Sequence, residues 1–72
     1  MSAIELQDER ILRVADILEQ VQSVDEMIHL HRKKGDANDI MLLQYEYRRS
    51  NFLKELGLVL QGLSIMPRDL AA

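Results

Sequence analysis

Residues 32–39, Arg-Lys-Lys-Gly-Asp-Ala-Asn-Asp, separate two long segments whose apolar residues recur at helical spacing. The three cations suit the last turn of a helix, where they oppose the negative end of its dipole. Gly35 can then adopt the left-handed conformation that closes a helix. Asp36 can cap a second helix, with Asp39 in its first turn and Asn38 as a competing cap. So short a connection predicts two antiparallel neighbouring helices.

The segment before this turn has the pattern of one amphipathic helix. Ser2 is followed three residues later by Glu5, which fits a capping box and places the helix start near Ala3. Asp25 falls on the heptad track of the apolar stripe, so we expect the seam to shift there toward Val24 and Ile28. The stripe consists of Ile4, Ile11, Val14, Leu18, Val21 and Ile28, and Ile17 and Val24 widen it on one flank.

The segment after the turn also carries an apolar stripe at heptad spacing, which Arg49 interrupts. Its middle, residues 44–51, is polar apart from two tyrosines, whereas residues 52–63 are densely apolar. The stripe consists of Leu42, Tyr45, Phe52, Leu56, Val59 and Leu63, and Leu53 and Leu60 broaden it. The pattern therefore predicts more apolar surface than one neighbouring helix covers.

The fold class expected from these patterns is all-α, a two-helix antiparallel hairpin of coiled-coil type. The single domain spans residues 1–72, with a helix over about 3–34, a turn over about 35–37, a helix over about 38–63 and a short tail over 64–72. Pro67 indicates that the tail leaves the second helix.

Two helices roughly 45 Å and 38 Å long cannot wrap into a compact monomer. In a lone hairpin we expect Ile17, Val24, Leu53 and Leu60 to stay in contact with water. A homodimer that forms a four-helix bundle removes this cost. The predicted core and dimer interface consists of Ile11, Val14, Ile17, Leu18, Val21, Val24, Ile28, Leu42, Tyr45, Phe52, Leu53, Leu56, Val59, Leu60 and Leu63.

The composition narrows the classes of protein. The chain has 72 residues, no cysteine and a net charge of −3, which excludes disulfides and argues against nucleic acid as the main partner. The acidic start does not resemble a secretory signal, and residues 40–43 form the longest aliphatic run, far below the roughly 18 residues that a spanning helix needs. We expect a soluble, cytoplasmic protein with no membrane association.

No catalytic or metal-binding motif is readable, so we expect neither an enzyme nor a cofactor. His29 and His31 point about 200 degrees apart on a helix and cannot hold one ion, although Asp25 lies on the same face as His29. Glu46 and Arg49 lie close to Tyr45 and Arg48, a set of groups that enzymes use. A slim bundle offers little room for a pocket, so we expect Arg49 to pair with an acid of the facing first helix, such as Glu19 or Glu26.

Two functions are compatible with these features. The leading hypothesis is a non-enzymatic protein–protein interaction or assembly module that self-associates and binds a further protein. The alternative is a small regulatory or nucleic-acid-associated protein that uses the basic tip, Arg32, Lys33 and Lys34, as a patch for an anionic partner. Asp36 and Asp39 lie beside this patch and dilute its field.

Overall fold

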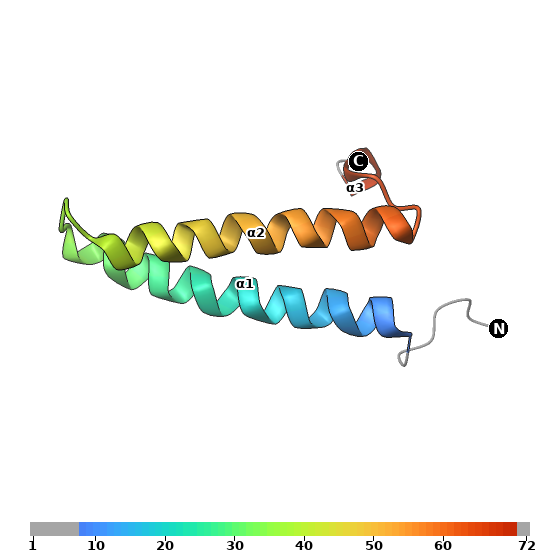
Figure 1. Ribbon diagram of the computed structural model, residues 1–72, viewed down its shortest axis with the longest axis horizontal. Coiled ribbons are helices and arrows are strands. Elements are labelled where there is room, and N and C mark those ends of the chain that lie inside the picture. Colours follow the sequence, from blue (N-terminus) through green and yellow to red (C-terminus); the bar gives the residue numbers. More distant parts are fainter. Residues whose placement is uncertain (1–7, 71–72) are drawn as a thin grey trace.

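The computed structural model describes residues 8–70, within which all regular structure is helical. Helix α1 (Glu9–Lys34) and helix α2 (Ile40–Gly62) lie side by side and run antiparallel, as Figure 1 shows. A short helix, α3 (Pro67–Leu70), follows at the open end of the hairpin. The all-α antiparallel hairpin expected from the sequence is thereby confirmed.

Helix α1 is closed at both ends by conventional caps. Asp8 has extended backbone, and its side chain accepts a hydrogen bond of 2.8 Å from the backbone N–H of Arg10. The helix therefore starts later than the expected position near Ala3, and the proposed capping box of Ser2 and Glu5 lies outside the described residues. At the other end Gly35 has a φ of 67° and donates its N–H to the carbonyl of Arg32, as the sequence predicted.

The cap of α2 differs from the expectation. Asp39, and not Asp36 or Asn38, is the N-cap, and its Oδ1 accepts a 2.9 Å hydrogen bond from the backbone N–H of Leu42. Asp36 instead accepts a hydrogen bond from the backbone N–H of Asn38 and stabilises the turn. The helix consequently begins at Ile40, two residues after the expected start.

Helix α2 ends in a Schellman motif. Ser64 adopts the left-handed conformation, with a φ of 63°. Its N–H donates to the carbonyl of Gln61 over 2.9 Å, and the N–H of Ile65 donates to the carbonyl of Leu60 over 2.8 Å. The tail therefore leaves the axis of α2 before Pro67, in agreement with the expected break, and then forms α3.

The core lies between the two helices and is small. Among the side chains that the structure describes, the buried hydrophobic ones are Ile17, Val24 and Ile28. The seam thus follows Val24 and Ile28 past Asp25, as expected. However, the expectation that Ile17 and Val24 stay wet in a lone hairpin was wrong, because both face α2 and are covered by it.

The hairpin is a rod with extents of 52 × 24 × 18 Å. Its radius of gyration is 15.3 Å, whereas a compact domain of this length has about 11 Å. A rod with one seam leaves most of its apolar side chains only partly covered. No helix within residues 8–70 is long and apolar enough to cross a lipid bilayer.

Candidate interaction surfaces

A groove runs along one flank of the hairpin, between the half of α1 near the tip and the facing part of α2. It encloses about 550 Å³ and is lined by Asp25, Ile28, Arg32, Glu46, Arg49, Ser50 and Leu53. We call this set the groove. Two ion pairs bridge the helices across it: Arg49 Nε donates to Asp25 Oδ1 over 2.6 Å, and Arg32 Nη2 donates to Glu46 Oε2 over 3.0 Å.

The expected pairing of Arg49 with an acid of the facing helix is confirmed, but the acid is Asp25. Arg49 does not reach Glu19 or Glu26, because both acids lie on the part of α1 that faces away from α2. Asp25, which interrupts the apolar track, lies on the flank of α1 beside α2 and is therefore the acid that pairs with Arg49. Asp25 thus pairs with α2, whereas His29, four positions further along the same side of α1, is exposed.

The flank that carries the groove continues into apolar surface toward the open end of the hairpin. Leu18 precedes Asp25 by seven positions and so lies on the same side of α1. Leu60 follows Leu53 by seven positions on α2. Leu18 and Leu53 are exposed and Leu60 is half-buried, so this flank presents a patch of three leucines beside two neutralised ion pairs.

Four side chains lock the tip of the hairpin, and we call them the tip cluster: His31, Asp39, Tyr45 and Arg48. Asp39 Oδ2 lies 2.6 Å from His31 Nδ1, and the two side chains are only 9% and 15% exposed. The His31 ring packs at a tilt against the Tyr45 ring, with centroids 5.5 Å apart, and the Arg48 guanidinium lies 5.7 Å from the centre of the Tyr45 ring.

The electrostatics of the tip cluster follow from its hydrogen bonds. The pKa of Asp39 is lowered from its ordinary value, chiefly by the hydrogen bond from the backbone N–H of Leu42 and next by His31. The carboxylate is therefore ionised near neutral pH, and His31 Nδ1–H donates to it. Asp39 thus joins the last turn of α1 to the first turn of α2 while it caps α2.

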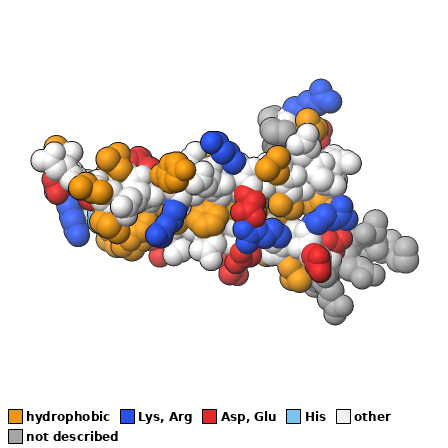
Figure 2. Space-filling model, viewed as in Figure 1, with side chains coloured by type: hydrophobic (Ala, Val, Ile, Leu, Met, Phe, Trp, Pro, Cys, Tyr) orange, Lys and Arg blue, Asp and Glu red, His pale blue; other side chains and the backbone are white. Residues whose placement is uncertain are grey.

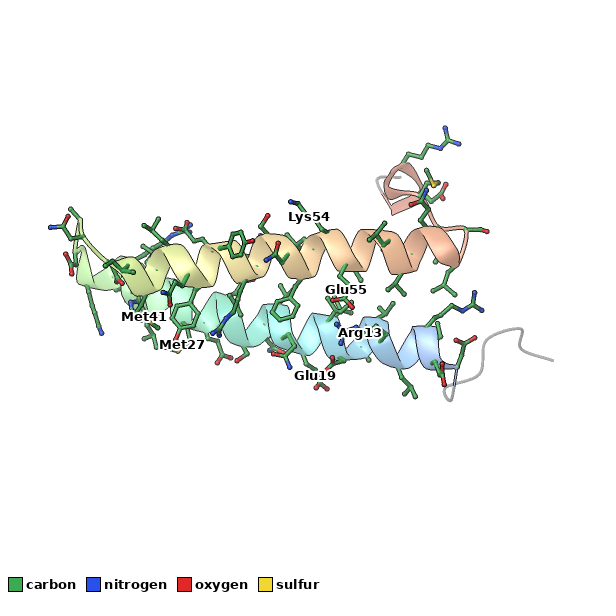
Figure 3. The ribbon with its side chains drawn as sticks, in the orientation of Figure 1. Arg13, Glu19, Met27, Met41, Lys54 and Glu55 are labelled. Carbon is green, nitrogen blue, oxygen red and sulfur yellow. The ribbon has the colours of Figure 1, made fainter. Side chains whose placement is uncertain are left out.

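The opposite flank carries a further bridge between the helices. Arg13 reaches across from α1 and pairs with Glu55 of α2, and its other nitrogen donates to Asp16 over 2.6 Å. Figure 3 shows Arg13 and Glu55 pointing toward each other between the two helices. Nearer the open end, Arg10 donates to the carbonyl of Gly62 over 3.2 Å, so polar contacts hold the ends as well as the middle.

The side of α2 that faces away from α1 is also apolar. Ile40, Leu43, Tyr47 and Leu58 recur at helical spacing and are between 66% and 70% exposed. We call these four residues the outer face of α2. Near the tip this face has a separate hollow of about 460 Å³, which Gln44, Arg48 and Asn51 also line. Figure 2 shows hydrophobic side chains along this edge of the molecule.

The structure distributes the fifteen predicted core and interface residues over three environments. Ile17, Val24 and Ile28 are buried, and Leu18 and Leu53 are exposed. The half-buried residues are Ile11, Val14, Val21, Leu42, Tyr45, Phe52, Leu56, Val59, Leu60 and Leu63.

The basic patch at the tip is less concentrated than its sequence suggests. Arg32 is paired with Glu46, whereas Lys33 and Lys34 are exposed. Lys34 also lies close enough to Asp39 to contribute to the low pKa of that carboxyl. Among the described residues, no three His, Asp or Glu side chains come close enough together to hold a metal ion.

Sequence reasoning missed the outer face of α2 and the tip cluster. The spacing of Ile40, Leu43 and Tyr47 was a usable signal for the outer face, but it was masked by the stronger stripe through Leu42 and Tyr45. The contact between His31 and Asp39 had no local signal, because it depends on how the turn folds. No protein-family model, curated protein or solved structure matches this chain.

Proposed function

We propose that this chain is a non-enzymatic protein–protein interaction module that self-associates, with a second copy covering the flank of the groove to form a four-helix bundle. The observation that carries the proposal is the ratio of exposed to buried apolar side chains. Among the described side chains, three hydrophobic ones are buried, whereas ten large ones are exposed. So small a buried core beside so many exposed apolar side chains is typical of a small chain that associates with a partner.

The chemistry of the flank favours a second copy as its occupant. The ion pairs Asp25–Arg49 and Arg32–Glu46 are satisfied within the chain, so a partner needs to supply no compensating charge there. A two-fold dimer brings the same patch together from both copies, which suits the leucines of the flank. Leu18, Leu53 and Leu60 would then form one apolar layer between the two hairpins, as in four-helix bundles.

The test is the mass in solution of the parent chain and of two variants, measured by sedimentation equilibrium. In dilute solution the parent is expected at two copies of its 8.4 kDa mass. Leu18→Asp and Leu53→Asp each place a carboxylate in the proposed interface, where burial without a partner costs several kcal/mol, so both should be monomeric. Both side chains are exposed within one hairpin, so the helical content of the monomer should persist.

Gln20→Asp is the matched control, because Gln20 is exposed on α1 but lies away from the flank. It adds the same charge and should leave the mass at two copies. A parent chain that stays at one copy up to millimolar concentration refutes the proposed function. A parent dimer that Leu18→Asp and Leu53→Asp do not dissociate refutes the assignment of the interface to this flank.

A further inference from the structure

The glutamates of α2 face α1, whereas two of its cations lie on other sides of the helix. Its two glutamates point toward α1, where Glu46 pairs with Arg32 and Glu55 pairs with Arg13. Arg48 borders the 460 Å³ hollow on the outer face of α2. Lys54 points away from α1, as Figure 3 shows. Within residues 8–70 neither of these two cations has an acidic partner. The outer face of α2 therefore combines apolar side chains with cations that have no acidic partner.

The side of α1 that faces away from α2 has the opposite charge. Glu19 and Glu26 are exposed there, seven positions apart, and neither has a cationic partner among the described residues. Figure 3 shows Glu19 pointing away from α2. Leu12 and Leu30 flank the two acids and are exposed as well. We call Leu12, Glu19, Glu26 and Leu30 the outer face of α1; Lys33 lies beyond it, toward the tip.

The two outer faces match in length and in the order of their groups. Leu12 and Leu30 are eighteen positions apart, as are Ile40 and Leu58, and this spacing corresponds to roughly 27 Å along a helix. In an antiparallel alignment Leu12 lies opposite Leu58, and Leu30 lies opposite Ile40 and Leu43. The same alignment sets Glu19 opposite Lys54 and Glu26 opposite Arg48.

This alignment is the one that the chain already uses internally. Asp25 of α1 pairs with Arg49 of α2, and Glu26 and Arg48 are their immediate neighbours in the sequence. A second hairpin placed beside the first by simple translation would therefore bring its α1 against the outer face of α2 in the same register. Neither hairpin needs to change its shape to make the contact.

From these matches we infer that the outer face of α2 docks the outer face of α1 of another copy, antiparallel, through apolar ends and two central charge pairs. The inference rests on self-association as the proposed function and adds a second contact, separate from the flank of the groove. The two faces lie on opposite sides of one hairpin and differ from each other, so the contact is head-to-tail and does not close. Assemblies should thus grow beyond two copies as concentration rises.

The experiment measures weight-average mass by sedimentation equilibrium between 10 µM and 1 mM total protein in low salt. The parent should exceed two copies at the upper end of this range. Arg48→Glu with Lys54→Glu makes both outer faces acidic, and Glu19→Lys with Glu26→Lys makes both basic. Each double variant alone should lose the lateral contact, with an association constant at least about tenfold weaker, because attraction becomes repulsion at two places.

Mixing the two double variants in equal amounts is the decisive step. Each acidic face then meets a basic face, so the mixture should regain the mass of the parent. Lys34→Glu with Arg68→Glu is the control, since both residues are exposed and lie beyond the ends of the two faces, and the change in net charge equals that of Arg48→Glu with Lys54→Glu. This control should behave as the parent does. Salt at 1 M should weaken the lateral contact in all samples, because exposed charge pairs are screened.

The outcomes separate the two proposals. A parent that remains at two copies throughout, or double variants whose mass equals that of the parent, overturns the lateral contact and leaves the dimer in place. Loss of the higher masses that mixing does not restore also overturns it. A parent at one copy throughout overturns both. Higher masses that survive Leu53→Asp but disappear in the charge variants keep the lateral contact and remove the groove dimer.

Discussion

Ile17 and Leu18 are neighbours in the sequence, yet the structure gives them opposite roles. Ile17 is 0% exposed and Leu18 is 53% exposed in the single hairpin. Truncation of Ile17 to Ala removes three buried carbons, which costs about 2.4 kcal/mol at about 0.8 kcal/mol per carbon, and the cavity left behind adds to this. Truncation of Leu18 removes carbons that are half in water, so it should cost at most about 1 kcal/mol in a monomer.

The assay is urea unfolding followed by circular dichroism at 222 nm, at several protein concentrations. In dilute solution Ile17→Ala should lower the free energy of unfolding by about 3 kcal/mol and Leu18→Ala by about 1 kcal/mol. As concentration rises and the flank is covered, the loss from Leu18→Ala should grow, while that from Ile17→Ala stays nearly constant. Ile17→Val, expected to cost about 1 kcal/mol, serves if Ile17→Ala unfolds the chain.

Equal losses for Ile17→Ala and Leu18→Ala in dilute solution would show that the seam of α1 does not run where the structure places it. A loss from Leu18→Ala that is independent of concentration would leave the seam intact but speak against a second copy on the flank. The pair of variants therefore tests the fold and the assembly separately.

Three further predictions concern the backbone and the tip. Gly57→Ala should raise the free energy of unfolding by about 0.5–1 kcal/mol, because a Cβ at Gly57 meets nothing within 4 Å and alanine favours a helix interior; thermal unfolding measures the gain. Ser64→Gly should stabilise by up to about 1 kcal/mol, because Ser64 has a φ of 63°, and a loss in the same assay would contradict the Schellman end of α2. Asp39 has a lowered pKa in the folded state, so its contribution to stability is present above the ordinary value of 3.8 and is lost as pH falls from there through the lower folded pKa. Asp39→Asn, which still caps a helix, should flatten this acid loss in urea titrations across that pH range, and an unchanged pH dependence would contradict the cap and the pairing with His31.

The hairpin itself could be predicted from the sequence because its signals are local. Gly35 after three cations is a strong helix end, and the two apolar stripes have the period of a helix. The same argument placed the seam at Val24 and Ile28, since a carboxylate at Asp25 is costly inside an apolar seam. These features can be predicted from the sequence of one helix without the position of the other.

The details that failed depend on contacts between the helices. Asp36, Asn38 and Asp39 are all good caps by residue type, and Asp39 prevails where its second oxygen also pairs with His31. Arg49 pairs with Asp25 rather than Glu19 or Glu26, because the rotation of α1 about its own axis decides which acid faces α2. That rotation also buries Ile17 and leaves Leu18 outside, whereas the heptad track placed Leu18 in the seam and Ile17 on its flank.

The surfaces could be predicted only in part for the same reason. Composition indicated an excess of apolar residues, but it did not indicate which side of each helix would carry them. The sorting of charge, with Glu46 and Glu55 drawn inward while Arg48 and Lys54 remain on the outside, becomes visible only after the helices are paired. The lateral contact inferred above depends on this sorting.

Self-association follows from the apolar surface that one hairpin leaves uncovered. The most direct measurement is the mass of the parent chain in solution by sedimentation equilibrium, with helical content recorded on the same samples. The species in the sample should contain at least two copies of the 8.4 kDa chain, fully helical. A fully helical species of one copy at every concentration up to millimolar would contradict it.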